Sequence, residues 1–216
     1  MTVVYFWKIK KVSIPLALFH MAFDRFLLKR VAGISFFKSI GTGSGEKFTP
    51  SDADPLVWGL IAVVDDPSLL DSSRVVKLWN KISQTKMRML LEPISSHGAW
   101  GGTNPFTTSD YKTDGKIVAI TRARIKWNKN LLFWRAVPAV TESLHSQPGL
   151  IRALGIGEAP IGLQGTLSIW ENAASLRTFA YKGEAHKGAI TATEKHQWYT
   201  EELFARFALI EMRGSI

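Results

Sequence analysis

The stretch WGLIAVVDDPSLL, residues 58–70, has a second version in GTLSIWENAASL, residues 165–176. Each begins as an apolar run, which predicts a buried strand, and ends at the polar start of a helix. A second matching pair precedes them, FFKSIGTGSGE at 36–46 and LIRALGIGE at 150–158. The chain therefore contains an internal repeat of about 100 residues.

The elements around these stretches follow the same order, βαββαβ, in each half of the chain. Apolar or alternating runs predict the strands, and apolar residues at helical spacing predict the helices. The first half is predicted to hold strands at 3–11, 33–40, 56–64 and 87–94, and helices that begin at Ser13 and run over 66 to about 85. The second half is predicted to hold strands at 116–127, 150–158, 164–170 and 201–212, and helices at 128–144 and from 172 onward.

This order predicts an α+β fold. A βαββαβ unit is the ferredoxin-like split βαβ, whose helices cover one face of an antiparallel sheet. The other face must also be buried, and two copies in one chain can pack those faces together. We therefore expect tandem ferredoxin-like repeats that form a fused dimeric α+β barrel, with the first repeat at 1–98, a linker at 99–115 and the second repeat at 116–216.

The first predicted helix has a stripe of apolar residues at spacings of three and four, the pattern of a face that packs on a core. The stripe consists of Leu16, Phe19, Phe23, Phe26 and Leu27. His20 also falls on an apolar stripe of this helix and is predicted to be a core histidine. His97 and His196 are predicted to be solvated, and His145 to lie at a helix end, where an imidazolium suits the helix dipole.

Composition excludes several classes of site. The chain has no cysteine, which excludes disulfides, cysteine-ligated metals and cysteine nucleophiles. Its net charge is +9, but the basic residues are scattered, which disfavours nucleic acid as a partner and leaves peripheral contact with an anionic membrane as an expectation. Charged residues interrupt the apolar first 30 residues, so we expect neither an export signal nor a membrane span there, and a cytoplasmic protein.

GTGSGEK, residues 41–47, resembles a phosphate-binding loop but fails both common patterns. Glu46 stands where a Walker motif has glycine before its lysine, and the following FTP does not open a helix as a Rossmann fingerprint requires. The five histidines form no HExxH motif, and no Ser-His-Asp arrangement is visible. Nucleotide binding and the common hydrolase chemistries are therefore not supported.

His186 is the candidate ligand for a bound group. If the last helix runs through residue 190, spacings of four, three and four from Phe179 place Gly183, His186 and Ile190 on its sheet-facing side. The residues around His186 are small, so a planar macrocycle with the imidazole as axial ligand would fill the space beside it. A hydrogen-bonded core histidine and a frayed helix end are the alternatives.

Three arginines are candidate catalytic residues. Alternation puts Arg122 and Arg124 on one strand face with apolar neighbours, and Arg206 on a face with Ala208. Because the first and last strands of a ferredoxin-like unit are neighbours, the three arginines are expected to converge. They would bind a haem propionate or polarise bound oxygen, and solvated or ion-paired strand arginines are the alternative.

Long stretches of the chain resemble the spheroidene monooxygenase family, over about residues 33 to 208. The stretches are FFKSIGTGSGEKFTP at 36–50, SSHGAWGGTNPF at 95–106, TRARIKWNKNLLFWRAVPAV at 121–140, GIGEAP at 155–160 and EELFARF at 201–207. The resemblance implies a haem-dependent monooxygenase on the dimeric α+β barrel fold that adds oxygen to an acyclic carotenoid. It also implies haem b as cofactor, His186 as the iron ligand and an electron donor such as ferredoxin.

One departure from the family text stands in the turn after GIGE. Ile161 and Leu163 occupy the places of a bulky aromatic residue and a histidine, so the resemblance implies a changed substrate if this turn lines the substrate pocket. A haem enzyme of the same barrel fold acting as a dehydratase or peroxidase is the alternative function, and a protein that binds haem or an apolar pigment without catalysis is another. A homo-oligomer is a further expectation.

Overall fold

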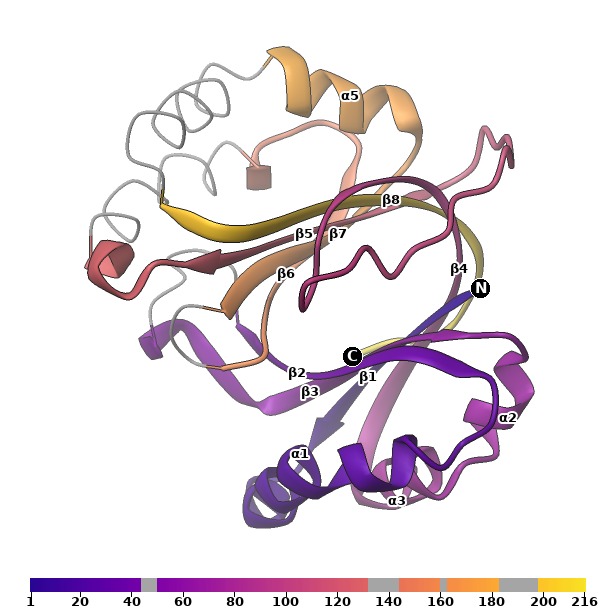
Figure 1. Cartoon of the computed structure of the whole chain (residues 1–216), viewed down its shortest axis with the longest axis vertical. Helices are drawn as coiled ribbons and strands as arrows, with labels where there is room; N and C mark the ends of the chain where they lie inside the picture. The colour runs from indigo at the N-terminus through magenta and orange to yellow at the C-terminus, as the bar shows by residue number, and fades with distance from the viewer. Residues whose placement is uncertain (44–49, 132–143, 160–162, 183–197) are drawn as a thin grey trace.

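A computed structural model of the chain describes residues 1–43, 50–131, 144–159, 163–182 and 198–216. Its strands close into an antiparallel barrel with helices on the outside (Figure 1). The strands are β1 Thr2–Ile9, β2 Ile34–Gly43, β3 Ala53–Val64, β4 Ser83–Gly98, β5 Ile117–Ile125, β6 Leu150–Gly157, β7 Leu163–Trp170 and β8 Tyr199–Gly214. The helices are α1 Ile14–Leu28, α2 Pro67–Asp71, α3 Arg74–Ile82 and α5 Ala173–Lys182, with short 3-10 turns at Lys11–Ser13, Pro50–Asp52 and Trp127–Lys129.

The order of strands around the barrel is β1-β3-β2-β6-β7-β5-β8-β4. It divides into β4-β1-β3-β2 and β8-β5-β7-β6, which is the same ferredoxin-like order twice. A long antiparallel pairing of β4 with β8 joins the halves on one side, and a short pairing of β2 with β6, from Gly41 opposite Gly157 to Gly43 opposite Gly155, joins them on the other. The predicted fold class is confirmed, while the residue limits of the two repeats and the linker stay a prediction.

Apolar side chains from all eight strands fill the barrel interior, as alternation along each strand requires. On β1, for example, Val4 and Phe6 point inward, and Val3, Tyr5 and Trp7 point outward toward the helices. Each fully buried large apolar side chain contributes about 1.5–3 kcal/mol relative to an exposed one. The interior is therefore a packed core of the fold.

Helices α1, α2 and α3 cover the outer face of the first-half sheet, and α5 lies on the opposite side of the barrel (Figure 1). Aromatic residues fill the space between that sheet and its helices. Trp7 of β1 stacks on Trp79 of α3, with ring centroids 5.3 Å apart, and Trp58 of β3 lies 6.3 Å from Trp79. No helix among the described residues has the length and apolarity of a membrane span.

The helix predicted over 66 to about 85 is two helices. Asp66 caps α2 by accepting a hydrogen bond from the Ser68 N–H at 2.8 Å, and Ser73 caps α3 by accepting one from the Val76 N–H at 3.3 Å. The second cap starts a new helix within the predicted one, and β4 already begins at Ser83.

The predicted core-facing stripe of α1 is wrong. Most of its residues are exposed, namely Leu16 at 44%, Phe19 at 53%, Phe23 at 49% and Phe26 at 49%. The buried face instead carries Ala17, His20, Asp24 and Leu28. His20 is the core histidine that the sequence predicted, and its Nδ1 lies 2.9 Å from Asp24 Oδ1.

Candidate functional site

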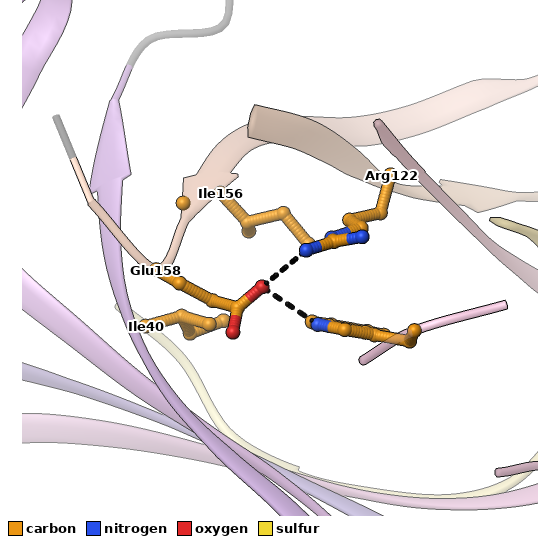
Figure 2. Close-up of a pocket in the computed structure, with 6 residues that line it drawn as sticks. Ile40, Arg122, Ile156 and Glu158 are labelled. Carbon is orange, nitrogen blue, oxygen red and sulfur yellow. Dashed lines mark hydrogen bonds and ion pairs between the residues drawn. The ribbon is translucent and has the colours of Figure 1, made fainter. Parts of the chain in front are cut away.

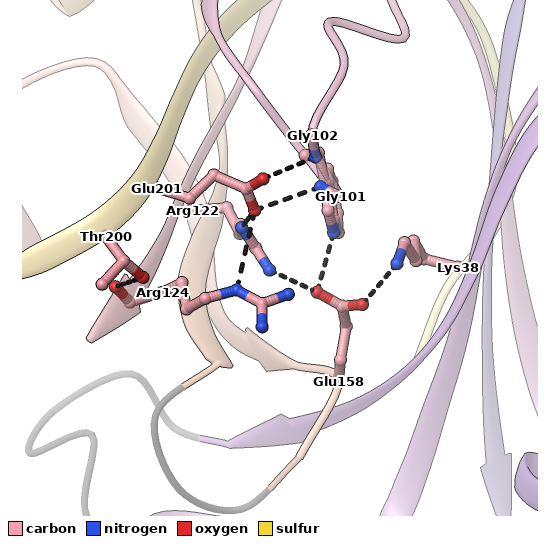
Figure 3. Close-up of polar contacts among 9 residues, drawn as sticks. Lys38, Gly101, Gly102, Arg122, Arg124, Glu158, Thr200 and Glu201 are labelled. Atoms are coloured by element: carbon pink, nitrogen blue, oxygen red, sulfur yellow. Dashed lines mark hydrogen bonds and ion pairs between the residues drawn. The ribbon is translucent and has the colours of Figure 1, made fainter. Parts of the chain in front are cut away.

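Arg122 is the centre of a charged cluster inside the barrel. Its side chain points inward from β5 with those of Val118 and Ile120 and is 2% exposed. Its Nη2 donates to Glu158 Oε1 at 2.9 Å, and its Nη1 donates to Glu201 Oε1 (Figure 3). Arg122 is thus the ion-paired strand arginine that the sequence left as an alternative.

Glu158, directly after β6, joins this cluster to the first half of the chain. It accepts hydrogen bonds from Lys38 Nζ at 2.7 Å and from the Trp100 indole N–H at 2.8 Å (Figures 2 and 3). Burial alone would raise the pKa of Glu158, but Lys38, Trp100 and the charge of Arg122 outweigh burial and lower that pKa below its usual value. The carboxylate is therefore charged at neutral pH.

Glu201, on β8, is the second carboxylate of the cluster. It accepts hydrogen bonds from the backbone N–H groups of Gly101 at 3.1 Å and Gly102 at 2.6 Å. Both glycines have positive φ angles, 75° and 88°, a conformation that favours glycine. Burial would raise the pKa of Glu201, but these N–H groups and Arg122 lower it overall.

The stretches that carry the family resemblance meet in this cluster, although they are far apart in the chain. They supply Lys38, then Trp100, Gly101 and Gly102, then Arg122, Glu158 and Glu201. Sequence analysis identified Arg122 but missed its partners. A signal for Glu201 was available, because it alternates in phase with Leu203 and Ala205, two inward-pointing apolar residues of β8.

A small hollow lies beside the cluster (Figure 2). It has no volume that a water molecule could occupy, and it is lined by Ile40, Trp100, Arg122, Ile156, Gly157 and Glu158. The charges of Lys38 and Arg122 are balanced by those of Glu158 and Glu201. We therefore interpret the cluster as a connection between β2, β5, β6 and β8 that leaves no room for a ligand.

The structure does not bring the three predicted arginines together. Arg124 has a side chain 49% exposed, and its Nε lies 3.9 Å from Glu201 Oε1. Arg206 points to the other face of the sheet, because Arg122 pairs with Leu203 and an offset of three residues along β8 reverses the face. The expected convergence of Arg122 and Arg206 is wrong for this reason.

Arg206 can be compared with Arg88 of the first half of the chain. It lies opposite Ala119 of β5, as Arg88 of β4 lies opposite Tyr5 of β1. Both arginines are thus on the helix-facing side of their sheets, although Leu90, opposite Val3, holds the place of Arg206 in the first repeat. Arg88 is held by ion pairs with Asp71 at the end of α2 and with Glu211 of β8.

Around Arg206 the helix-facing side of the second half carries small residues where the first half carries large ones. By strand pairing, Val3 and Ala62 of the first half correspond to Ala119 and Ser168, Tyr5 and Leu60 correspond to Thr121 and Thr166, and Trp7 and Trp58 correspond to Ala123 and Gln164. The Thr121 and Thr166 hydroxyls are hydrogen-bonded to each other at 2.6 Å. Side chains that fill the first-half layer are therefore replaced by side chains that do not reach as far from the sheet.

Two aromatic residues mark the edge of this small-residue face. Phe179 of α5 stacks on Trp170 of β7, with centroids 5.5 Å apart and an interplanar angle of 29°. The side of α5 that contains Phe179 thus faces the sheet, as predicted. The other predicted cofactor-binding residues, Gly183, His186 and Ile190, lie outside the described residues.

The histidines that the structure describes are not placed to bind a cofactor on this face. His20 is buried against Asp24 in the first half, and His97 and His145 are exposed. His196 lies outside the described residues. Within those residues, no group of three histidine, aspartate or glutamate side chains comes together to hold a metal ion.

Comparison with known proteins gives the family. The chain is 35% identical over 210 residues to spheroidene monooxygenase from Rhodobacter capsulatus, a match that covers 94% of this chain and 87% of the relative. The chain belongs to the spheroidene monooxygenase family. Spheroidene monooxygenase from Cereibacter sphaeroides is 34% identical over 185 residues, which is 83% of this chain and 57% of the relative. No protein-family model matches the chain.

Solved structures support the fold of this spheroidene monooxygenase family member. A crystal structure of aldoxime dehydratase matches with a TM-score of 0.58 at 11% identity, over 96% of this chain and 80% of that chain. At this identity the likeness shows the fold alone. Family membership confirms the predicted enzyme class, a monooxygenase.

Proposed function

We propose that this chain is a haem-dependent monooxygenase that oxygenates an acyclic carotenoid or another apolar substrate. The family supplies the class of reaction. The observation that carries the cofactor site is the small-residue face of the second half, with Thr121, Thr166 and Ala123 in the places of Tyr5, Leu60 and Trp7. A planar macrocycle between this face and its helices would take the place of the missing aromatic layer.

We infer that a haem would lie on this face and not inside the barrel. The barrel interior is a packed apolar core, and the hollow beside Arg122 excludes even water. On the helix-facing side, the apolar edge formed by Trp170 and Phe179 suits contact with a porphyrin ring, since aromatic faces stack favourably on other flat π systems.

His186 would hold the haem iron. It stands seven positions after Phe179, about two helical turns, so a helix continued beyond α5 would present both on the sheet-facing side. The absence of cysteine leaves imidazole as the strongest neutral iron ligand that the chain offers. When bound with an open position, haem activates O₂ for insertion into a substrate.

Arg206 would pair with a haem propionate. It lies on the same face as Ala119 and Ala208, and its Nη2 donates to Ser95 Oγ at 3.2 Å. A guanidinium can bind a carboxylate through two parallel hydrogen bonds, which fixes orientation as well as charge. Arg206 would therefore set how the cofactor lies against the sheet. Arg122 and Arg124 are on the barrel side of the sheet, so their roles would be confined to that side.

The reaction also needs electrons from outside the chain. Monooxygenation puts one oxygen atom of O₂ into the substrate and reduces the other to water, which consumes two electrons and two protons. An external donor such as a ferredoxin would supply the electrons. If the turn that contains Ile161 and Leu163 lines the substrate pocket, the apolar substrate differs from spheroidene.

The first test is spectroscopic. We expect the purified protein reconstituted with haem b to show a Soret band, and the His186→Ala variant to lose it. The His145→Ala variant is the matched control, because that histidine is exposed, and should keep the band. A folded wild-type protein that stays colourless would overturn the haem proposal, as would an unchanged band in the His186→Ala variant.

The second test is turnover. We expect oxygenated product from an acyclic carotenoid only when O₂ and a reduced ferredoxin are both present. Turnover of an aldoxime or peroxide without an electron donor would instead identify a dehydratase or peroxidase. Bound haem or pigment without turnover under any of these conditions would identify a binding protein.

A further inference from the structure

The outward face of α1 is apolar. Leu16, Phe19, Phe23 and Phe26 recur at spacings of three, four and three, and each is between 44% and 53% exposed. Phe19 and Phe23 stack on each other, with ring centroids 4.4 Å apart. On the same helix Leu18 is 56% exposed. These five exposed apolar residues of the helix are here called the α1 apolar face.

Contacts on the buried side of α1 fix the rotation of the helix about its axis, and this rotation turns the α1 apolar face outward. On the opposite side of the helix, Asp24 is 1% exposed and bonded to two partners. His20 Nδ1 lies 2.9 Å from Asp24 Oδ1, and the Trp79 indole N–H donates to Asp24 Oδ2 at 2.6 Å. Turning the α1 apolar face inward would expose this buried network and break its hydrogen bonds, at a cost that apolar burial would have to exceed.

The exposed charges along residues 8–30, the segment that contains α1, have one sign. Over residues 8–30 the basic side chains are all exposed, namely Lys8, Lys10, Lys11, Arg25, Lys29 and Arg30. The one acidic residue of this range is Asp24, which is buried. Exposed aromatic and leucine side chains flanked by lysine and arginine are the pattern of a helix that lies in the interface of an anionic membrane.

We propose that α1 docks this protein on an anionic lipid surface, with the α1 apolar face in the boundary between headgroups and acyl chains. The basic residues would lie at the level of the lipid phosphates. A second copy of the chain is the less favourable occupant, because a two-fold contact would bring identical basic rims together. Anionic lipid headgroups would neutralise these basic residues, whereas a second copy of the chain would not.

The docking surface is independent of the haem site. Figure 1 places α1 and α5 on opposite sides of the barrel, so docking would concentrate the enzyme at a membrane without opening the cofactor site directly onto it. Docking would bring the enzyme close to an apolar substrate dissolved in the lipid phase. Only this purpose of docking rests on the proposed function. Vesicle binding is measured without turnover, so it can fail or succeed separately from the oxygenase proposal.

The test is flotation of the full-length protein with vesicles of phosphatidylcholine containing phosphatidylglycerol, compared with phosphatidylcholine alone. We expect binding to the anionic vesicles that weakens with salt. The variant Phe19→Ser, Phe23→Ser, Phe26→Ser should bind about 100-fold more weakly, because each half-exposed ring contributes about a factor of five. A matched control replaces exposed apolar residues elsewhere, at 43%, 50% and 40% exposure, and should bind like wild type: Leu69→Ser, Tyr111→Ser, Met212→Ser.

The charge contribution has its own pair of variants. Lys10→Gln, Lys11→Gln, Lys29→Gln should weaken binding to anionic vesicles by about 100-fold and leave the weak binding to neutral vesicles unchanged. The control triple, Lys77→Gln, Lys112→Gln, Lys116→Gln, removes the same charge from other exposed positions and should have a much smaller effect.

Three outcomes would overturn the proposal. Wild-type protein that stays with the unbound fraction on anionic vesicles is one. Equal loss of binding in the phenylalanine triple and its control, with both variants folded by circular dichroism, is another. The third is a wild-type dimer by light scattering that becomes a monomer in the phenylalanine triple without any vesicle binding, which would assign the face to a second copy.

Discussion

Replacing Arg122 with methionine removes the central cation of the barrel cluster and keeps a side chain of similar length. In the native protein Arg122 bridges Glu158 and Glu201, whose side chains are 15% and 14% exposed. Without the guanidinium the two carboxylates face each other across an apolar side chain. We expect this variant to fold but to be clearly less stable than wild type.

The size of the effect follows from the burial of the groups and from the partners that remain. Removing one member of a buried ion pair costs about 3–5 kcal/mol. Glu158 keeps its hydrogen bond from Lys38, and Glu201 keeps those from the backbone N–H groups of Gly101 and Gly102. We therefore expect the lower end of that range, a loss of about 3 kcal/mol at pH 7.

The effect should also depend on pH. The folded state lowers the pKa of both Glu158 and Glu201 below the usual 4.5, so their contribution to stability is complete above that value and is lost as the pH falls below it. In the Arg122→Met variant the cation that lowers these pKa values is gone, and acid should reduce its stability less. The difference in unfolding free energy between the two proteins should therefore shrink below pH 4.5.

The assay is urea unfolding followed by tryptophan fluorescence, at pH 7 and at pH 4. Arg124→Met is the matched control, because Arg124 is half exposed and 3.9 Å from the same Glu201 carboxylate, and its loss should be below about 1 kcal/mol. The reasoning is refuted if the two variants lose equal stability at pH 7, or if the Arg122→Met deficit is the same at both pH values.

Three further predictions follow from the two sheet faces and from the glycine at position 165. Ala119→Tyr puts a large aromatic side chain on the small-residue face and should weaken haem binding at least tenfold in a titration of the Soret band, and unchanged affinity would argue against a cofactor there. Gly165→Ala should lower the unfolding free energy by more than about 2 kcal/mol in urea titrations, because its Cβ would lie 2.1 Å from the Thr121 carbonyl oxygen, and a neutral effect would contradict that close approach. Tyr5→Phe removes the hydrogen bond donated to Asp71 and should cost about 1 kcal/mol at pH 8. Since burial and Asp71 raise the pKa of Tyr5 above its usual 10, wild type should lose stability above pH 10 relative to Tyr5→Phe, and parallel stability curves would disprove that assignment.

Helix α1 shows what the spacing of apolar residues can and cannot predict. The spacing of Leu16, Phe19, Phe23 and Phe26 correctly predicted a helix but not which face packs on the core. Hydrophobic preference alone would bury the phenylalanines. The face was decided by Asp24 and its bonds to His20 and Trp79, and Trp79 is 55 residues away in the chain.

The charged cluster shows the same limit for strands. Alternation put Arg122 and Arg124 on one face, which the barrel confirms, but it could not say that Arg206 points to the other face of the neighbouring strand. That depends on the register between β5 and β8. A shift of one residue would have reversed it, and the sequence of neither strand alone specifies the register.

The sequence by itself determined the doubled βαββαβ order, the barrel that follows from it and the family, because strand and helix periods and long matching stretches are properties of neighbouring residues. Only the tertiary structure decided which charges are paired and which apolar residues stay exposed. Lys38 and Glu158 are 120 residues apart, and Arg122 and Glu201 are 79 apart. Such pairs form only when the barrel closes. The free energy of burying a charged side chain depends on whether an oppositely charged partner is buried beside it.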